Sequence, residues 1–305
     1  MGAPRLMSLE NSHWQVGILP YNGASIAYTR IWHDGSWVDL LRPTPVSAYN
    51  SVEDSASFVL IPWASRIANA TFRFNGTTYS LRSQHTARYA MHGIVRDYPW
   101  RIETSKADRL GLTFQSADHA DANFPFRFSA RLEFLLEGNC FRIKTALKNE
   151  DSQPMPGGFG HHPFFQRNLD GTSDAVEVEI PCHRYFDLSH GVPNSASQPI
   201  PARLDFTRLR PLGRDGIDDC LVGKEDKPIR IVYPNAGRSI LFHADSIFQI
   251  VVLYVPENSN FFAVEPLTLA TDGFNLFDKK IPDSGVFVLQ SGQEQSGTLA
   301  LEIEK

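Results

Sequence analysis

The strongest constraint on how this chain can fold is a strict alternation of apolar and polar side chains in two consecutive segments. From Phe126 to Phe134 every second residue is apolar, and the residues between them are Arg, Ser, Arg and Glu. After a Glu137-Gly138-Asn139 stretch typical of a turn, the alternation resumes from Phe141 to Leu147. Because successive strand residues point to opposite faces, this pattern predicts an antiparallel hairpin with one buried and one exposed face.

Other short apolar runs have the length of strands, whereas helical periodicity is missing. No window of a dozen residues carries an apolar stripe at i, i+3, i+4 and i+7 without an interrupting proline or glycine. We therefore predict an all-β protein, a large antiparallel β-sandwich forming one domain over residues 1–305, with surface loops at Asp187–Pro201 and Asp215–Pro228. Further strands are expected at Ser25–Trp32, Leu110–Gln115, Val176–Ile180, Ile229–Tyr233, Ile247–Val255, Val286–Gln290 and Leu299–Glu304.

Composition and charge exclude several classes of function. The 305 residues include 42% hydrophobic and 21% charged side chains, which is enough apolar surface for a large core. The net charge of −5, with Lys and Arg dispersed among acidic residues, does not favour nucleic acid or an anionic membrane as a partner. Neither a membrane-spanning apolar run nor a secretory leader is visible, so we expect a cytoplasmic protein.

The cysteines do not form a recognisable framework. Cys140, Cys182 and Cys220 are odd in number, far apart and without a C-x-x-C pair. This spacing argues against a disulfide scaffold and against a cysteine-based zinc site, so we predict buried thiols. The sequence makes no prediction of the oligomeric state.

The stretch Gly157–Phe165 is the first candidate for a functional site. It reads Gly-Gly-Phe-Gly-His-His-Pro-Phe-Phe and places His161 beside His162. Glycine lets the backbone approach a ligand closely, and histidine has the unperturbed pKa nearest neutrality. Successive strand residues point to opposite faces, so both rings could serve one site only if the backbone bends there. Metal binding, proton transfer and a structural turn all remain possible for this pair.

Glu265 is a second candidate, because it is a single carboxylate among the apolar residues of Phe261–Leu267. If it is buried, desolvation raises its pKa toward the range useful for a general base; a structural carboxylate is the alternative. Three more polar residues are candidates: Arg66 in the segment Ile61–Ile67, which contains Pro62, His92 before Gly93, and Asp218 beside Asp219. Each has a structural alternative: Arg66 as a rim arginine, His92 as a turn residue and Asp218 as part of a solvated loop.

Two familiar kinds of catalytic centre do not fit the spacing. His92, His161, His162 and Glu265 are zinc ligands by residue type, but no H-x-H or H-E-x-x-H spacing joins them. We therefore predict no metal site. A Ser-His-Asp hydrolase is also disfavoured, because the chain has no G-x-S-x-G and no nucleophile within Gly-Phe-Gly-His-His.

Five motifs and a short early segment occur in a characteristic order along the chain. The early segment is Asn-Gly-Ala-Ser-Ile at residues 22–26, and the motifs are P-W-A-S-R-I-A-N-A-T-F-R-F-N-G-T-T-Y-S-L (62–81), M-H-G (91–93), G-H-H-P-F-F (160–165), I-D-D-C (217–220) and F-A-V-E-P-L-T (262–268). In this order they resemble the aldose 1-epimerase, or galactose mutarotase, family, and the resemblance covers nearly the whole chain. It implies a large single-domain β-sandwich with its site on a concave face, in agreement with the strand pattern.

The resemblance assigns roles to individual residues. Glu265 matches the family's general base and His162 its general acid, while His92 matches a second histidine at the anomeric end. Arg66 and Asp218 match positions that hold sugar hydroxyls.

Several positions around this acid and base depart from the family pattern. Trp63 stands where members of the family often have tyrosine, and we expect it to pack on the sugar's apolar face. Ser65 and His161 each stand where asparagine is common, and Pro163 where serine is common. These departures bear on sugar preference, so His161 is included among the sugar-binding candidates, with shaping of the bend at Pro163 as its alternative role.

The implied activity is interconversion of α and β anomers of a monosaccharide, without a cofactor. The arginine-glycine-glycine stretch of the hexose-6-phosphate branch is missing, which favours an unphosphorylated hexose. One alternative is a sugar-binding or sensor protein that keeps the fold without turnover. Another is an epimerase of an uncommon sugar, such as a sulfonated, deoxy or uronic hexose, with Arg88 and Arg96 near an anionic group or else as surface arginines.

The missing metal-ligand spacing leads to a first prediction. Mutarotation measured by polarimetry should be unchanged after treatment with EDTA, because the implied acid and base need no metal. Strong inhibition that added zinc reverses would instead support a zinc site.

Overall fold

The predicted hairpin is present. The computed structural model describes residues 6–83, 88–169, 171, 175–193 and 195–304. Strands β12 (Phe128–Glu137) and β13 (Cys140–Asn149) pair antiparallel along their whole length, from Phe128 opposite Asn149 to Glu137 opposite Cys140. Their alternating burial agrees with the alternation in sequence, because the apolar side chains face the core.

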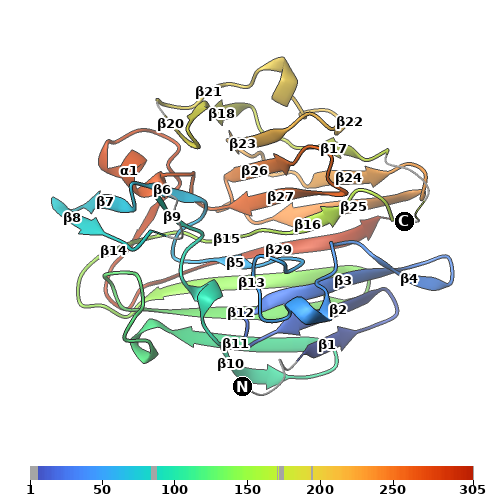
Figure 1. Cartoon of the computed structure of the whole chain (residues 1–305), viewed down its shortest axis with the longest axis horizontal. Helices are drawn as coiled ribbons and strands as arrows, with labels where there is room; N and C mark the ends of the chain where they lie inside the picture. The colour runs from blue at the N-terminus through green and yellow to red at the C-terminus, as the bar shows by residue number, and fades with distance from the viewer. Residues whose placement is uncertain (1–5, 84–87, 170, 172–174, 194, 305) are drawn as a thin grey trace.

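This hairpin lies inside a nine-stranded sheet, the larger of two main sheets in the described part of the chain (Figure 1). Every pairing in the sheet is antiparallel. Its order is β10 (Arg101–Ser105), β11 (Arg109–Gln115), β12, β13, β29 (Glu294–Glu304), β25 (Arg238–Ala244), β24 (Ile229–Tyr233), β17 (Glu177–Glu179) and β22 (Arg210–Pro211).

The second main sheet has eight strands and is also antiparallel. Strand β27 is central to it and pairs with both β15 and β16. The strands are β21 (Gln198–Pro199), β18 (Arg184–Phe186), β23 (Ile217–Val222), β26 (Ile250–Val255), β27 (Phe261–Leu267), β15 (Gly160–His161) and β5 (Val59–Leu60), with β16 (Phe164–Gln166) beside β27.

Smaller elements surround the two sheets. A four-stranded sheet contains β1 (Met7–Glu10), β2 (Trp14–Leu19), β3 (Ser25–His33) and β4 (Ser36–Asp39). Two-stranded pairs are β6 (Arg66–Ala68) with β9 (Tyr89–Met91), β7 (Thr71–Phe74) with β8 (Thr77–Ser80), β14 (Met155–Gly157) with β28 (Phe287–Leu289), and β19 (Leu188–Ser189) with β20 (Val192–Pro193). Within the described ranges the helices are α1 (Gly273–Asp278) and the 3₁₀ turns Val46–Ala48, Val95–Asp97, Ser116–Asp118 and Ala202–Leu204.

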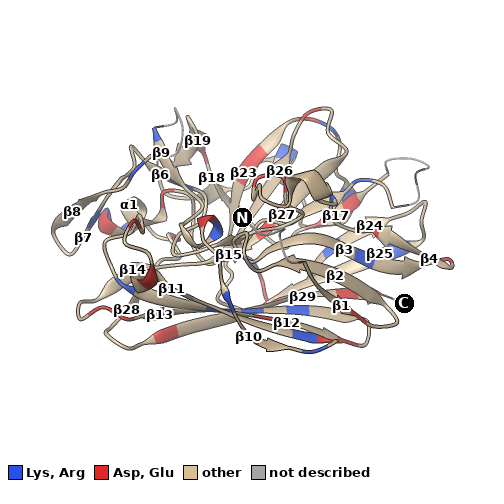
Figure 2. Ribbon diagram, turned by 60° about the horizontal axis from the view of Figure 1, so that its bottom comes forward, with Lys and Arg blue, Asp and Glu red and all other residues tan. Residues whose placement is uncertain are grey.

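The two main sheets lie in separate layers, which Figure 2 shows with β15, β26 and β27 above β12, β13 and β29. Aromatic side chains fill the space between them. Phe165 of β16 stacks on Phe262 of β27 with ring centroids 5.6 Å apart, and it contacts Phe242 of β25 at 5.9 Å. This contact between sheets buries all three rings, so the prediction of an all-β antiparallel sandwich is confirmed.

No helix in the described part of the chain is long and apolar enough to cross a membrane. The prediction for the cysteines is confirmed, since Cys140, Cys182 and Cys220 are buried and free.

The prediction of two surface loops was wrong in part. Asp187–Pro201 contains the short strands β19, β20 and β21, and Asp215–Pro228 contains β23, an internal strand of the eight-stranded sheet. The Asp218-Asp219 pair suggested solvent, but the strand sends the two carboxylates to opposite faces. Asp219 is buried against Arg203, with Oδ2 and Nη1 2.8 Å apart. Pairing with Arg203, which lies 16 residues from Asp219 in the chain, therefore makes a charged strand possible.

The two histidines of the glycine-rich stretch point to opposite sides of the eight-stranded sheet. His161 of β15 is 3% exposed, and its Nε2 lies 2.8 Å from the hydroxyl of Thr145 on β13, in the nine-stranded sheet. Burial lowers the pKa of His161 to about 3, so the ring is neutral in the core. His161 therefore joins the two sheets.

The hydrogen bond between His161 and Thr145 leads to a stability prediction. Thr145→Val keeps the shape of the side chain but leaves a buried imidazole nitrogen without a partner, which costs about 1–3 kcal/mol of unfolding free energy. Urea denaturation should measure this loss. The control Thr78→Val, on the exposed part of β8, should change stability by less than about 0.5 kcal/mol. Equal effects of the two substitutions would contradict the structural role of His161.

Candidate active site

A cleft of about 370 Å³ opens on the face of the eight-stranded sheet opposite the core. Alternation along β27 explains its place: Phe262 packs between the sheets, so Phe261 and Glu265 face the other side. The lining residues are Arg42, Glu53, Phe58, Ser65, Arg66, Met91, His92, His162, Phe164, Asp218, Val252, Tyr254, Phe261 and Glu265.

Strand register brings residues from three strands to the cleft floor. Val252 of β26 lies directly opposite Glu265 of β27, and Tyr254 of β26 lies opposite Asp218 of β23. Because these four positions share one face of the sheet, their side chains converge although they are far apart in sequence.

His162 and Glu265 form a close buried pair in this cleft. The Nε2 atom of His162 lies 3.2 Å from Oε1 of Glu265, and the two residues are 8% and 3% exposed. The backbone N–H of His162 donates to the carbonyl of Phe58 at 3.0 Å. The imidazole also lies against two aromatic rings, with centroid distances of 4.9 Å to Phe58 and 4.3 Å to Phe164. Both groups are therefore held in a largely apolar wall.

Burial changes the proton affinity of both members of this pair. Desolvation raises the pKa of Glu265 well above its usual range; the charge of Asp218 raises it further, and Arg66 lowers it. Desolvation lowers the pKa of His162 to about 3, assisted by Arg96 and Arg42. The carboxylate is consequently a strong proton acceptor, and the imidazolium, where it forms, is a strong proton donor.

The ring of His92 meets the ring of His162 edge to face, with centroids 5.6 Å apart. Its backbone is left-handed, with φ of 62°, and its N–H donates to the carbonyl of Ser65 at 2.8 Å. The next residue, Gly93, has φ of 69°, and a Cβ there would lie 1.9 Å from the carbonyl oxygen of Ile61. Only glycine fits this turn, so the Met-His-Gly sequence has both a structural role and a place in the cleft. Burial lowers the pKa of His92 well below its usual value, and the nearby charges of His162, Arg96 and Arg66 lower it further.

Arg66 and Asp218 form an ion pair at the mouth of the cleft. Arg66 Nη2 lies 3.0 Å from Oδ2 of Asp218, and their side chains are 22% and 45% exposed. Asp272 supports the strand that carries Arg66: its N–H donates to the Arg66 carbonyl at 2.7 Å, and its carboxylate accepts the N–H of Ala68 at 2.9 Å. These bonds hold the backbone of β6, from which the Arg66 guanidinium reaches Asp218 on β23.

The expected roles of Trp63 and His161 in sugar binding are not supported by their positions. Trp63 is 1% exposed, packs on Phe124 with ring centroids 5.9 Å apart, and does not line the cleft. His161 faces the core, as described above, whereas His162 faces the cleft, because adjacent residues in extended backbone point to opposite sides. Both residues have structural roles at these positions.

The two arginines considered for an anionic group also lie outside the lining of the cleft. Arg88 is exposed. Arg96 is 4% exposed rather than a surface residue; it forms an ion pair with Glu53 and lies over the Phe58 ring, 4.7 Å from its centroid. Burial against an aromatic ring explains how an arginine can be placed behind the cleft wall.

Sequence reasoning missed Arg42, Tyr254 and the three phenylalanines at positions 58, 164 and 261. Strand alternation could have indicated that Phe261 faces the cleft, because it lies four positions from Glu265 on β27. In the same way Tyr254 lies two positions from Val252 on β26. Arg42 follows Leu40-Leu41 and precedes Pro43, a context typical of a loop, so only the tertiary structure brings it to the cleft.

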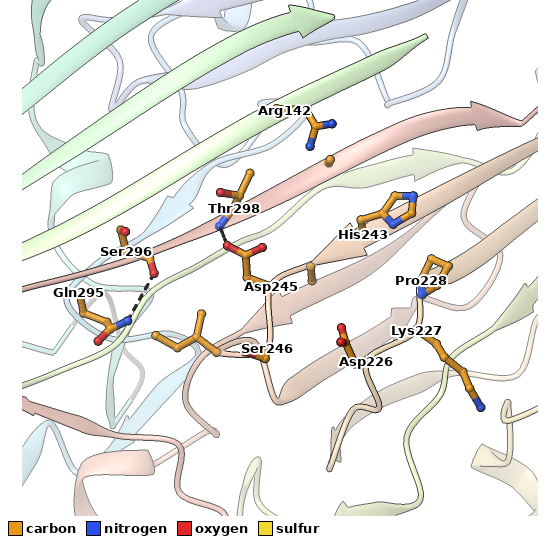
Figure 3. A pocket seen from close by; sticks show the side chains of 13 residues that line it. Arg142, Asp226, Lys227, Pro228, His243, Asp245, Ser246, Gln295, Ser296 and Thr298 are labelled. Atoms are coloured by element: carbon orange, nitrogen blue, oxygen red, sulfur yellow. Dashed lines mark hydrogen bonds between the residues drawn. The ribbon is translucent and has the colours of Figure 1, made fainter.

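A larger hollow of about 640 Å³ lies between β25, β29 and the loop before β24 (Figure 3). Its Asp245 accepts the backbone N–H of Thr298 at 2.7 Å. His243 pairs with Glu302 at 3.0 Å, but these side chains are 44% and 38% exposed and stay hydrated. Because no described residue lining this hollow belongs to a buried acid and base pair, the cleft is the better candidate.

The described residues contain no group of three or more His, Cys, Asp or Glu side chains arranged to hold a metal ion.

Comparison with known proteins agrees with the architecture. The chain is 24% identical over 285 residues to the uncharacterized protein YphB of Escherichia coli K12, a match that covers 89% of this chain and 92% of that protein. It is 27% identical over 197 residues to the aldose 1-epimerase of E. coli K12, covering 61% of this chain and 55% of that protein.

A galactose mutarotase-like protein from Clostridium acetobutylicum has a similar fold. The TM-score is 0.87 at 19% identity, and the match covers 98% of this chain and 94% of that chain. The sequence model of the aldose 1-epimerase family matches residues 5–302. Because that match spans nearly the whole chain, the protein belongs to the aldose 1-epimerase family.

Proposed function

We propose that the protein is an aldose 1-epimerase that interconverts the α and β anomers of an unphosphorylated hexose by general acid and base catalysis. The observation that carries this proposal is the buried pair of His162 and Glu265, whose Nε2 and Oε1 atoms lie 3.2 Å apart at the cleft surface. Membership of the family supports an isomerase that acts on a sugar. The cleft volume of about 370 Å³ is adequate for one monosaccharide.

Ring opening requires two proton transfers at neighbouring oxygens. In the proposed mechanism the carboxylate of Glu265 accepts the proton of the C1 hydroxyl, and His162 donates a proton from Nε2 to the ring oxygen. The bond between C1 and the ring oxygen breaks, and C1 becomes the carbonyl carbon of an open-chain aldehyde. Rotation about the C1–C2 bond presents the other carbonyl face, and reversal of both transfers closes the ring as the other anomer.

The geometry of the pair suits these transfers. Both reacting oxygens are bonded to C1, so the acid and the base that serve them must be neighbours, as His162 and Glu265 are. The productive form carries its proton on His162. The lowered pKa of His162 favours release of its proton to the ring oxygen, and the raised pKa of Glu265 favours capture of the proton of the C1 hydroxyl. Each positioned transfer typically contributes on the order of a hundredfold or more to the rate.

The remaining cleft residues would bind and orient the sugar. Arg66 and Asp218 present a donor and an acceptor to ring hydroxyls near Glu265, and His92 contributes its ring beside His162. Phe58, rather than Trp63, offers an aromatic face to the apolar side of the pyranose. A protein that only binds sugar would not need the opposed acid and base.

Removal of the acid or the base should abolish most catalysis. Glu265→Gln and His162→Ala are each expected to lower kcat for mutarotation of α-D-glucose and α-D-galactose by about a hundredfold or more. Polarimetry on freshly dissolved sugar measures the rate. Glu257→Gln and His183→Ala, at exposed positions, are matched controls that should keep wild-type rates. Wild-type rates in both cleft variants would refute the mechanism, and sugar affinity without any acceleration by the wild type would favour a binding protein.

The electrostatics of Glu265 lead to a pH prediction. Activity requires the pair to hold one proton, which is on His162 in the productive form, and the raised pKa of Glu265 is the pKa at which the pair loses this last proton. The value of kcat/KM should therefore fall on the alkaline side as pH rises through this raised pKa. Asp218 raises the pKa of Glu265, so Asp218→Asn should move this alkaline limb to lower pH. Arg66 lowers it, so Arg66→Met should move the limb to higher pH. Profiles of kcat/KM against pH test both directions, and a limb that stays in place in both variants would overturn this assignment of Glu265.

A further inference from the structure

Arg42 lines the cleft in an unusual environment. Its guanidinium carbon lies over two aromatic rings, 4.1 Å from the centroid of Phe164 and 4.6 Å from that of Phe261. Its Nη2 donates to the backbone carbonyls of Glu53 at 3.3 Å and Ser55 at 3.0 Å. Two rings and two carbonyls therefore hold the guanidinium in position, and its remaining donors are available to the cleft.

The positive charge of Arg42 is not neutralised by the protein. Arg66 is paired with Asp218, and Arg96 with Glu53. Across the part of the chain that the structure describes, no carboxylate oxygen lies within 4.0 Å of Arg42. Asp54 is exposed and acts on Arg42 only from a longer distance, and desolvation lowers the pKa of the arginine. The cleft consequently carries one cation without a counter-charge.

Arg42 lies at the His162 end of the cleft. The Phe164 ring is in contact with both residues, 4.3 Å from the His162 ring and 4.1 Å from the Arg42 guanidinium. The charge of Arg42 affects the pKa of His162, whereas Asp218 and Arg66 affect that of Glu265. Arg42 and the ion pair of Arg66 with Asp218 therefore lie on different sides of the catalytic pair.

The bonding of a pyranose ring relates the position of Arg42 to carbon C6 of the sugar. In the proposed function, on which this inference rests, His162 faces the ring oxygen and Glu265 faces the C1 hydroxyl. The ring oxygen is also bonded to C5, and C5 carries C6. A substituent on C6 is therefore directed toward the side of the cleft where Arg42 lies, away from the pair formed by Arg66 and Asp218.

We propose that the substrate is a hexopyranose with a single negative charge on C6, as a carboxylate or a sulfonate, and that Arg42 binds this group. One unpaired guanidinium neutralises one anion, and the N–H groups on Nε and Nη1, which the two carbonyls leave free, can donate to oxygens of either group. The stacking of Phe164 and Phe261 keeps the guanidinium oriented without a competing carboxylate. Arg42, and not Arg88 or Arg96, is thus the specificity residue for an anionic sugar.

Substrate comparison tests this proposal directly. Anomeric exchange measured by NMR gives kcat/KM for glucuronate and for 6-deoxy-6-sulfoglucose, with neutral 6-deoxyglucose as the reference. At least one of the anions should exceed the reference by about tenfold or more, and the better one identifies the group. A reference sugar that equals or exceeds both anions would overturn the proposal. Glucose 6-phosphate should not exceed the better anion, and a preference for it would overturn the single charge.

Variants of Arg42 connect the preference to this residue. Arg42→Met should lower the ratio of anionic to neutral kcat/KM by about tenfold to a hundredfold, and Arg42→Lys should recover part of it. Arg210→Met is a matched control, because Arg210 also lies over a ring, Phe206 at 4.7 Å, and donates to two backbone carbonyls outside the cleft. Its ratio should equal that of the wild type. An unchanged ratio in Arg42→Met would overturn the proposal.

Calorimetry separates a failure of this proposal from a failure of the proposed activity. If the wild type accelerates none of these sugars, the epimerase assignment fails, and the charge preference is then measured as affinity. Tighter binding of glucuronate or 6-deoxy-6-sulfoglucose than of 6-deoxyglucose, lost in Arg42→Met, supports the anion site. Equal affinities of the wild type for charged and neutral sugars overturn it.

Discussion

The desolvated carboxyl group of Glu265 is the constraint on which the rest of the site depends. A buried carboxylate is costly unless a partner or a proton compensates it. His162 supplies the partner at 3.2 Å, and the phenylalanines around its ring keep water away from the pair. The same exclusion of water shifts the two pKa values in opposite directions, which is the property that acid and base catalysis requires. The contact between His162 and Glu265 therefore matters both for the stability of the site and for the proposed chemistry.

Strand β27 carries both the core and the site, because its two faces serve different purposes. Phe262 joins the stack that connects the two sheets, while Glu265 and Phe261 face the cleft. The histidine pair repeats this division, with His161 bonded to Thr145 across the core and His162 in the cleft. A rigid sandwich thus holds the groups at fixed distances, as positioned proton transfer needs.

Much of the fold followed from local pattern, and less of the site did. The hairpin of β12 and β13 was predicted correctly because one face of it is buried and the other hydrated. β23 was taken for a loop because adjacent aspartates are typical of solvated loops, whereas here Asp219 pairs with Arg203, which lies outside the strand. Trp63 was expected in the cleft, but its aromatic character suits the core equally well, and neighbours distant in sequence decide between the two.

The sequence by itself determined the β architecture, the family resemblance and the residues that could act as acid and base, since periodicity and ordered motifs are local properties. Only the tertiary structure decided which of two adjacent histidines reaches the cleft, that Glu265 is buried beside it, and that Arg42 enters the same space without a counter-charge. These features depend on strand register and on contacts across more than a hundred residues of chain. Desolvation and charge pairing arise from such contacts, so a local pattern cannot specify them.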